Sequence, residues 1–292
     1  MECLELSGGG SVQFGCCISG HAQAKSQDEA LSSLIGQLKA LQESGYDFAE
    51  LSVSGLMNFT DDTFDRLVTY LADASFPTRA ANNFIPGSIR LTGEHIDSKK
   101  AYDYVDAAMA RLKRLGVGTI VFGSSGARNI PEGFSRDTAL RQLDDFLLIC
   151  NTLATQHDVI VAVEPLNRRE SNVFQMVGEV FDHVSSLHLD HVRVLADWYH
   201  MYVEGEGTEA IVRADRQIAH VHIANHDRFR PGIEARDDEE FLDLFRTLQA
   251  IEYPGLISVE CRFTDFDREI RETLSYVKDT WEQANIGADG EL

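Results

Sequence analysis

Short apolar stretches alternate with longer amphipathic stretches along most of the chain, and this alternation restricts the fold more than any other feature. The apolar stretches are rich in β-branched and aromatic residues, which is typical of strands. The amphipathic stretches repeat apolar residues at a spacing of three or four, which is typical of helices packed on a core. Strands that alternate with helices predict a parallel sheet with right-handed crossovers. Eight such pairs in 292 residues predict one closed (β/α)8 barrel.

The expected fold is α/β, a single (β/α)8 TIM barrel that spans residues 1–292, with frayed ends at 1–10 and 284–292. Ser26 is expected to open the first helix and Gly45 to end it, and Thr60 is expected to open the second. A doubly wound open sheet is the alternative, but the first strand is not followed by the G-x-G-x-x-G loop typical of that fold. The strands are expected at residues 11–19, 48–54, 79–84, 118–122, 159–163, 192–196, 218–223 and 256–261. The later helices are expected at about 98–115, 135–156, 174–187, 209–214, 238–251 and 265–283.

The composition disfavours several classes of protein. With 26 basic and 47 acidic residues, the chain has a formal charge of −21, which repels the phosphates of nucleic acids. No run of about 18 apolar residues predicts a membrane span, and the N-terminus has no signal-peptide pattern. The five cysteines lack Cys-x-x-Cys spacing, which indicates reduced thiols. These observations favour a cytoplasmic protein that binds neither nucleic acid nor membranes.

Four consecutive strands, the fifth to the eighth, end in side chains that can bind a metal ion. These side chains are Glu164, Asp197, His222 and Glu260. Side chains alternate between the two faces of a strand, and in each case the residues on the opposite face are apolar. The carboxyl ends of barrel strands meet at one mouth, where barrel enzymes carry their active sites. We therefore expect the four side chains to converge there.

Three carboxylates in one poorly solvated cleft would repel one another and raise one another's pKa values. A divalent cation removes this repulsion. Oxygen ligands with a single imidazole suit Mn²⁺ or Mg²⁺, while Co²⁺ and Zn²⁺ are also compatible. The sequence therefore predicts a divalent-metal site, with Mn²⁺ as the expected ion.

The stretches around these residues resemble the motifs of the xylose-isomerase-like barrel superfamily, and within it those of the ketose 3-epimerases. The resemblance covers strands five to eight, and the N-terminal half matches in architecture alone. The motifs are Glu164-Pro-Leu-Asn-Arg-x-Glu170, Asp197-x-x-His200, His222-x-x-x-x-x-Arg228-x-x-Pro231-Gly232 and Ser258-Val-Glu260. The resemblance implies a metal-dependent isomerase or epimerase of a ketose or a sugar phosphate.

The resemblance also implies roles for individual residues. Glu164 and Glu260 would be metal ligands and the catalytic acid/base pair, which transfers protons through a cis-enediolate. Asp197 and His222 would complete the metal site. Substrate hydroxyls and the carbonyl end would be held by three further residues, Glu170, His200 and Arg228. His220, one layer deeper in its strand, is expected to be a core histidine with a hydrogen-bond partner.

Two stretches differ from the ketose epimerases and leave the substrate open. Asn225 and Asp227 stand where the epimerases tend to carry an acidic residue and an asparagine. After the fourth strand, a Gly/Ser-rich loop at residues 123–128 replaces an expected aromatic residue. We expect that this loop could bind a phosphate through its backbone and Arg128. Asn83, with Asn82, is expected to line a sugar pocket.

Three other functions remain open at this point. A lyase similar to inosose dehydratase could use the same metal and acids to expel water. A relative of the apurinic endonucleases is disfavoured by the charge of −21 and by the lack of further histidine ligands on the second and third strands. A binding barrel without catalysis is the third. The sequence leaves the oligomeric state open, with a homodimer or a homotetramer compatible with it.

Overall fold

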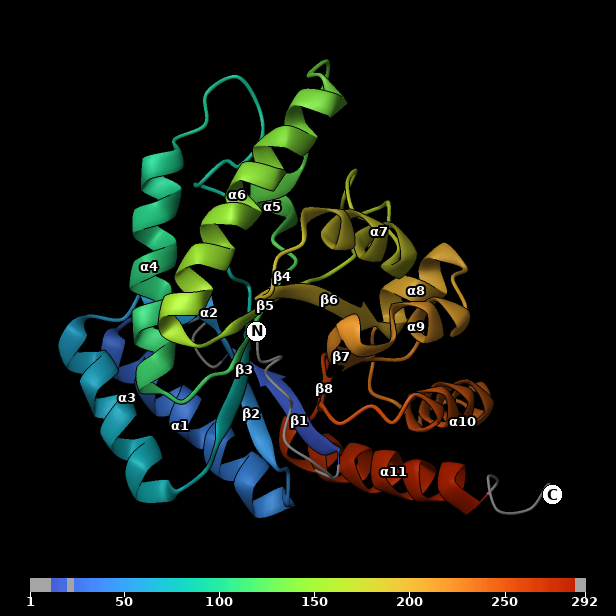
Figure 1. Cartoon of the computed structure of the whole chain (residues 1–292). Coiled ribbons are helices and arrows are strands. Elements are labelled where there is room, and N and C mark those ends of the chain that lie inside the picture. Colours follow the sequence, from blue (N-terminus) through green and yellow to red (C-terminus); the bar gives the residue numbers. More distant parts are fainter. Residues whose placement is uncertain (1–11, 20–23, 287–292) are drawn as a thin grey trace.

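The computed structural model describes residues 12–19 and 24–286, and within them eight parallel strands close into a barrel. The strands follow one another around the barrel in chain order, and β1 pairs with both β2 and β8. Helices surround the barrel, and the last helix packs beside the first (Figure 1). The predicted single (β/α)8 TIM barrel is confirmed.

The strands are β1 (Gln13–Ile18), β2 (Phe48–Ser52), β3 (Thr78–Asn82), β4 (Thr119–Phe122), β5 (Ile160–Val163), β6 (Val192–Asp197), β7 (Ile218–Ile223) and β8 (Leu256–Val259). The helices of the first half are α1 (Gln27–Ser44), α2 (Val53–Met57), α3 (Asp61–Ala74), α4 (Ser98–Arg114), α5 (Ser125–Arg128) and α6 (Arg136–His157). Those of the second half are α7 (Val177–Leu187), α8 (Trp198–Glu204), α9 (Glu209–Ala214), the 3-10 turn η1 (Asp215–Gln217), α10 (Ala235–Ala250) and α11 (Phe266–Ile286).

Helices α1 and α3 begin at the capping residues that the sequence predicts, and α1 also ends at its predicted residue. The Ser26 side chain accepts a hydrogen bond from the Glu29 backbone N–H at the start of α1. Gly45 ends that helix with φ of 87°, a left-handed conformation that glycine adopts without steric cost. Thr60 caps α3 in the same way as Ser26 caps α1.

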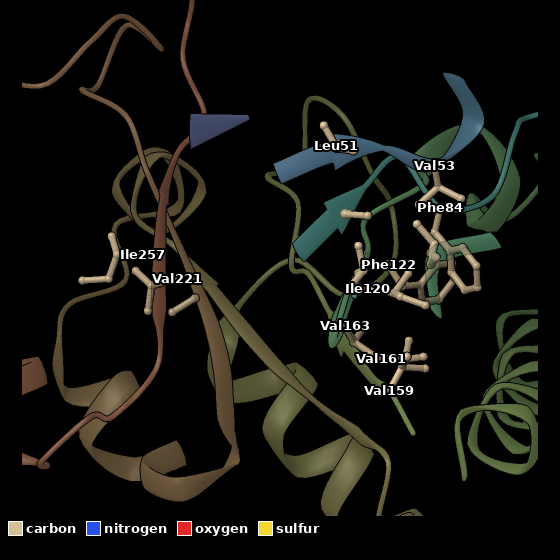
Figure 2. Packing of buried hydrophobic residues seen from close by; sticks show 14 of the residues in the cluster. Leu51, Val53, Phe84, Ile120, Phe122, Val159, Val161, Val163, Val221 and Ile257 are labelled. Carbon is tan, nitrogen blue, oxygen red and sulfur yellow. The ribbon is translucent and has the colours of Figure 1, made fainter. Parts of the chain in front are cut away.

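The barrel wall separates two apolar regions. The outward-facing residues of the strands pack against the helices, and Figure 2 shows Ile120 and Phe122 of β4 beside Val161 and Val163 of β5, their register partners. A small separate cluster of Val121, Ala162 and Leu195 fills the inside of the barrel. The alternation predicted for β5 and β6 is thereby confirmed, and it directs the polar residues at the ends of these strands into the mouth.

Several short elements differ from the sequence prediction. Residues 125–128, expected as a loop, form the single-turn helix α5, and α2 and α8 were not expected at all. Each is only four to seven residues long, so none shows a helical repeat of apolar residues. The last helix continues to Ile286, three residues beyond its expected end. Of the ends expected to be frayed, 1–10 and 284–292, residues 284–286 are instead helical in α11, while 1–10 and 287–292 lie outside the described residues.

Two expectations drawn from the composition concern membrane-spanning helices and the state of the cysteines. Within residues 12–19 and 24–286, no helix is long and apolar enough to cross a membrane. The four cysteines in these ranges are free, and Cys16 and Cys150 are buried. Cys3 lies outside the described residues.

Candidate active site

The four predicted metal ligands meet at the carboxyl end of the barrel. Glu164 follows β5, Asp197 ends β6, His222 lies in β7 and Glu260 follows β8. His222 Nδ1 lies 3.4 Å from Glu164 Oε1, 3.8 Å from Asp197 Oδ2 and 3.6 Å from Glu260 Oε2. One ligand atom from each residue lies within 4.8 Å of the other three. The strand ends thus bring together the residues that the sequence selected.

These residues fit a divalent cation. Within the described part of the chain, Glu164 Oε1 and His222 Nδ1 are buried and have no hydrogen-bond partner. Buried polar atoms without partners are costly, and here both face the same small space. Ligand atoms lie roughly 2.0–2.2 Å from such an ion, which is compatible with the observed spacing. The donor set is one imidazole nitrogen with three carboxylate oxygens.

Burial and neighbouring charges shift the pKa values of the carboxyl groups in the site. Burial raises the pKa of the Glu164 carboxyl, and the negative charge of Glu260 adds to this effect. Burial likewise raises the pKa of Asp197 to about 6. Burial would also raise the pKa of Glu260, but His222 and Arg228 outweigh it and lower that pKa to about 2. Crowded carboxyl groups whose pKa values are pushed apart are typical of functional sites.

Local structure orients two of the predicted ligands. Asp197 caps α8, because its Oδ1 accepts a hydrogen bond from the His200 backbone N–H at 3.0 Å. Its other oxygen, Oδ2, is therefore the one that faces His222. Glu164 lies against Gly123, where a Cβ atom would come within 2.0 Å of Glu164 Oε2. The glycine leaves room for the carboxylate.

Glu170 and Arg228 form the outer part of the site. One guanidinium nitrogen of Arg228 donates to Glu170 Oε1 at 3.0 Å, and the other donates to Glu260 Oε2 at 3.2 Å. The guanidinium also lies over the Tyr199 ring, 5.0 Å from its centroid. Arg228 has a φ of 62°, in the left-handed region that side chains rarely adopt. Such a conformation is retained where the surrounding structure holds it.

His200 is held in one orientation by Asn167. The Asn167 backbone N–H donates to His200 Nδ1 at 3.0 Å, so this ring nitrogen accepts and the neutral ring carries its proton on Nε2. His200 Nε2 is buried and has no partner among the described residues. The side-chain amide of Asn167 also donates to Glu170 Oε1 at 3.2 Å. Asn167 therefore links two of the predicted substrate-binding residues.

Arg128 does not lie where a phosphate-binding residue is expected. Its side chain is completely buried, and its guanidinium donates to the backbone carbonyls of Phe122 at 2.9 Å and Phe174 at 3.3 Å. Burial lowers the pKa of Arg128 to about 10. The turn of α5 directs this side chain inward, between the rings of the same two phenylalanines. The structure thus gives Arg128 a place in the wall of the barrel.

The two asparagines at the end of β3 point in different directions. Asn83 is exposed, has a φ of 52°, and its side-chain amide donates to Oδ1 of the neighbouring Asn82. Asn82 is buried, and its amide donates to Glu260 Oε1 at 3.0 Å. The left-handed backbone at Asn83 turns its side chain away, so Asn82 is the residue that faces the site.

Glu50, in the middle of β2, was not selected from the sequence. It is fully buried and hydrogen-bonds to His220 Nε2 at 2.7 Å and to His222 Nε2 at 3.0 Å. The expectation that His220 is a core histidine with a partner is confirmed. A carboxylate within the buried run Phe48–Ser52 was the available signal, and strand alternation would have directed it inward.

A closed parallel barrel whose carboxyl-end mouth carries three carboxylates and a histidine belongs to the class of (β/α)8 proteins with a functional site at the strand ends. The sequence family described as "Xylose isomerase-like TIM barrel" matches residues 38–280, and the chain belongs to this family.

Named relatives come from both sequence and structure. The chain is 23% identical to 3-dehydro-D-guloside 4-epimerase of Escherichia coli, over 84% of this chain and 94% of the relative. The structure of L-ribulose 3-epimerase superposes with a TM-score of 0.80 at 20% identity, covering 96% of this chain and 97% of that one. The structure of the IOLI protein with a bound zinc atom has a TM-score of 0.65 at 17% identity, covering 94% and 98%. The structural likenesses show the same fold.

Proposed function

We propose that this protein is a divalent-metal-dependent sugar epimerase that inverts a carbon next to a carbonyl group. The observation that carries the proposal is the convergence of Glu164, Asp197, His222 and Glu260 within 4.8 Å, with two buried ligand atoms left without partners. The two relatives named as epimerases support the reaction type. A 3-dehydro sugar inverted at carbon 4 and a 2-ketose inverted at carbon 3 share one chemistry, because the inverted carbon adjoins the carbonyl. The lyase alternative has no such support.

The four residues would hold the cation, and Mn²⁺ is the ion we propose. A bound divalent cation supplies positive charge next to the substrate oxygens and stabilises the negative charge that develops there. The zinc atom bound in the structure of the IOLI protein supports a metal in barrels of this fold.

The proton transfers are assigned to Glu164 and Glu260. They follow β5 and β8, three strands apart, and both approach His222 Nδ1, at 3.4 Å and 3.6 Å. In its ionised form, one carboxylate removes the hydrogen from the carbon beside the carbonyl as a proton, and the electron pair of the C–H bond moves into a cis-enediolate. The other carboxyl, in its acid form, delivers a proton to the opposite face of the same carbon. The two residues exchange roles in the reverse reaction.

Substrate hydroxyls would be held by the outer residues. His200 presents an Nε2–H that lacks a partner in the described structure, which suits an oxygen acceptor. Arg228 pairs with both Glu170 and Glu260, so Arg228 can donate hydrogen bonds to substrate hydroxyl groups and Glu170 can accept them. Asn82 donates to Glu260 and would orient that carboxylate during proton transfer.

We further propose that the substrate is an uncharged keto sugar. Arg128, the cation expected to bind a phosphate, is buried and donates to two backbone carbonyls. Arg228, at the mouth, is already paired with two carboxylates. A phosphate would therefore approach a site that carries several acidic groups and a chain of formal charge −21.

Exchange of carbon-bound hydrogen in D₂O tests the proposal. Purified protein with Mn²⁺ is incubated with free ketoses, 3-keto glycosides and the corresponding sugar phosphates, and deuterium uptake is followed by NMR. We expect uptake at the carbon beside the carbonyl of an uncharged sugar, together with formation of its epimer. If no substrate in the panel exchanges, the proposed reaction is wrong, and if the phosphates alone exchange, the proposed substrate class is wrong.

A further inference from the structure

We infer that Glu50 is a positioning residue that fixes the ring orientation and tautomer of His222, so that Nδ1 is the nitrogen offered to a metal ion. This inference rests on the proposed metal site. Glu50 lies in β2, whereas the four proposed ligands come from β5 to β8. In the described part of the chain, the Glu50 side chain hydrogen-bonds to His220 and His222 and to none of the three carboxylates, so it acts through His222.

Each carboxylate oxygen of Glu50 contacts a different histidine. One oxygen, Oε1, lies 3.0 Å from His222 Nε2, and the other, Oε2, lies 2.7 Å from His220 Nε2. All three side chains have zero exposure to solvent. The imidazole rings meet nearly edge to face, at 81°, with centroids 4.9 Å apart. The carboxylate is thus clamped between two rings and cannot rotate without breaking one of these bonds.

The chemistry of a carboxylate determines what His222 can do. An ionised carboxylate only accepts hydrogen bonds, so each facing Nε2 must carry a proton. In a neutral imidazole the other nitrogen then has a free lone pair. For His222 that nitrogen is Nδ1, which is buried, has no partner in the described residues and faces Glu164, Asp197 and Glu260. A carboxylate behind a ligand histidine also makes the ring a stronger metal donor.

His220 explains why a single Glu50 variant would be ambiguous. In Glu50→Gln the amide has one oxygen and one NH₂ group, and it can direct the NH₂ group toward either histidine. If His220 changed its tautomer to match, His222 would be unaffected. Removing His220 eliminates this choice.

A matched pair of double variants tests the inference. Glu50→Gln/His220→Leu keeps an acceptor for His222 Nε2, whereas Glu50→Leu/His220→Leu has none, and both lack the buried charge and the second histidine. Mn²⁺ affinity is measured by calorimetry in these proteins and in the wild type. We expect the leucine pair to bind Mn²⁺ about 10- to 100-fold more weakly than the glutamine pair. Equal affinities in the two pairs would overturn the role of Glu50.

The outcomes separate this inference from the proposed function. A wild-type protein that binds no Mn²⁺ would refute the metal site itself. A wild-type protein that binds Mn²⁺, with two double variants that bind it equally well, would refute the role of Glu50 alone.

A second measurement needs no variant, in case the leucine pair does not fold. ¹⁵N NMR of the histidine rings in Zn²⁺-loaded wild-type protein reports which nitrogen of His222 carries the proton. We expect a protonated Nε2 and a metal-bound Nδ1. The reverse assignment would overturn the inference, because Glu50 would then face the wrong nitrogen.

Discussion

Gly123 leaves the space that the Glu164 carboxylate occupies. A Cβ atom at position 123 would lie 2.0 Å from Glu164 Oε2 and 3.2 Å from its carboxyl carbon. Real atoms do not approach so closely, so any side chain at this position must displace the carboxylate. The glycine at the end of β4 is thus needed for the position of a residue at the end of β5.

We predict that Gly123→Ala lowers kcat at least about 100-fold, because small misplacements of a catalytic group have effects of that order. The matched control is Gly118→Ala, just before the same strand, where an added Cβ meets nothing within 4 Å. The control should keep full activity and fold at least as well as the wild type. Steady-state kinetics of both variants are the measurement, and equal kcat values would contradict the proposed role of the Glu164 position.

Glu164→Gln and Glu260→Gln should each abolish turnover and leave the fold intact. Glutamine preserves the shape of each side chain but cannot exchange a proton with carbon. The two readouts are formation of the epimer, followed by NMR, and circular dichroism. Glu43→Gln, on the exposed side of α1, is the control and should behave as the wild type. Near-normal epimer formation in either active-site variant would remove that residue from the acid/base pair.

The order of the strands and the inward direction of Glu164, Asp197, His222 and Glu260 could be predicted because both follow from periodicity. Alternation along a strand decides which face a residue takes, and parallel strands bring their carboxyl ends together. Predicting these four candidate ligands therefore required no knowledge of the loops.

The direction of loop side chains could not be predicted in this way. Arg128 turns inward because α5 forms one helical turn after Ser124, which has a φ of 45°. Asn83 turns outward because of its own left-handed backbone. No repeat in the sequence reports such single conformations. Glu50 was not predicted for a different reason. It lies in the middle of β2, and no candidate metal ligand marks the end of that strand.

Removal of the metal should destabilise the protein. An ion present at 100 times its Kd adds about 2.7 kcal/mol to the free energy of unfolding, so chelation should lower Tm by roughly 5 °C and added Mn²⁺ should restore it. In Asp197→Asn, the amide oxygen can still cap α8 while an NH₂ group replaces the ligand oxygen. This variant should fold but lose most of the response to Mn²⁺. Thermal unfolding with and without the ion is the measurement, and a Tm that Mn²⁺ never changes would contradict the metal site.

Arg128 is expected to contribute to stability. Arg128→Met would remove one of two donors from each of the carbonyls of Phe122 and Phe174, which still accept from backbone N–H groups, at a cost of about 0.5–1.5 kcal/mol for each hydrogen bond lost. The control Arg169→Met removes an exposed arginine and should change stability by less than about 0.5 kcal/mol. Denaturant unfolding gives both values. A stable Arg128→Met protein with a raised KM only for sugar phosphates would instead support phosphate binding.

Glu206 should stabilise the start of α7, although it belongs to a later part of the chain. Its two oxygens accept hydrogen bonds from the backbone N–H groups of Val177 at 2.7 Å and Gly178 at 3.0 Å. Met176, at the N-cap position, offers no side-chain cap, so Glu206 satisfies donors that would otherwise be buried without partners. Glu206→Gln replaces one acceptor by an NH₂ group that faces a backbone N–H, which should cost about 1–3 kcal/mol.

The loss at Glu206 should be local to α7, and this separates it from a general effect on the fold. Hydrogen exchange at the first turn of that helix should become faster in Glu206→Gln, while deuterium uptake by the substrate is retained. Glu209→Gln, an exposed neighbour on α9, removes a similar charge without a buried partner and should leave both readouts unchanged. If the two variants unfold at the same denaturant concentration, the carboxylate of Glu206 contributes only its charge, and the two backbone hydrogen bonds add nothing measurable to stability.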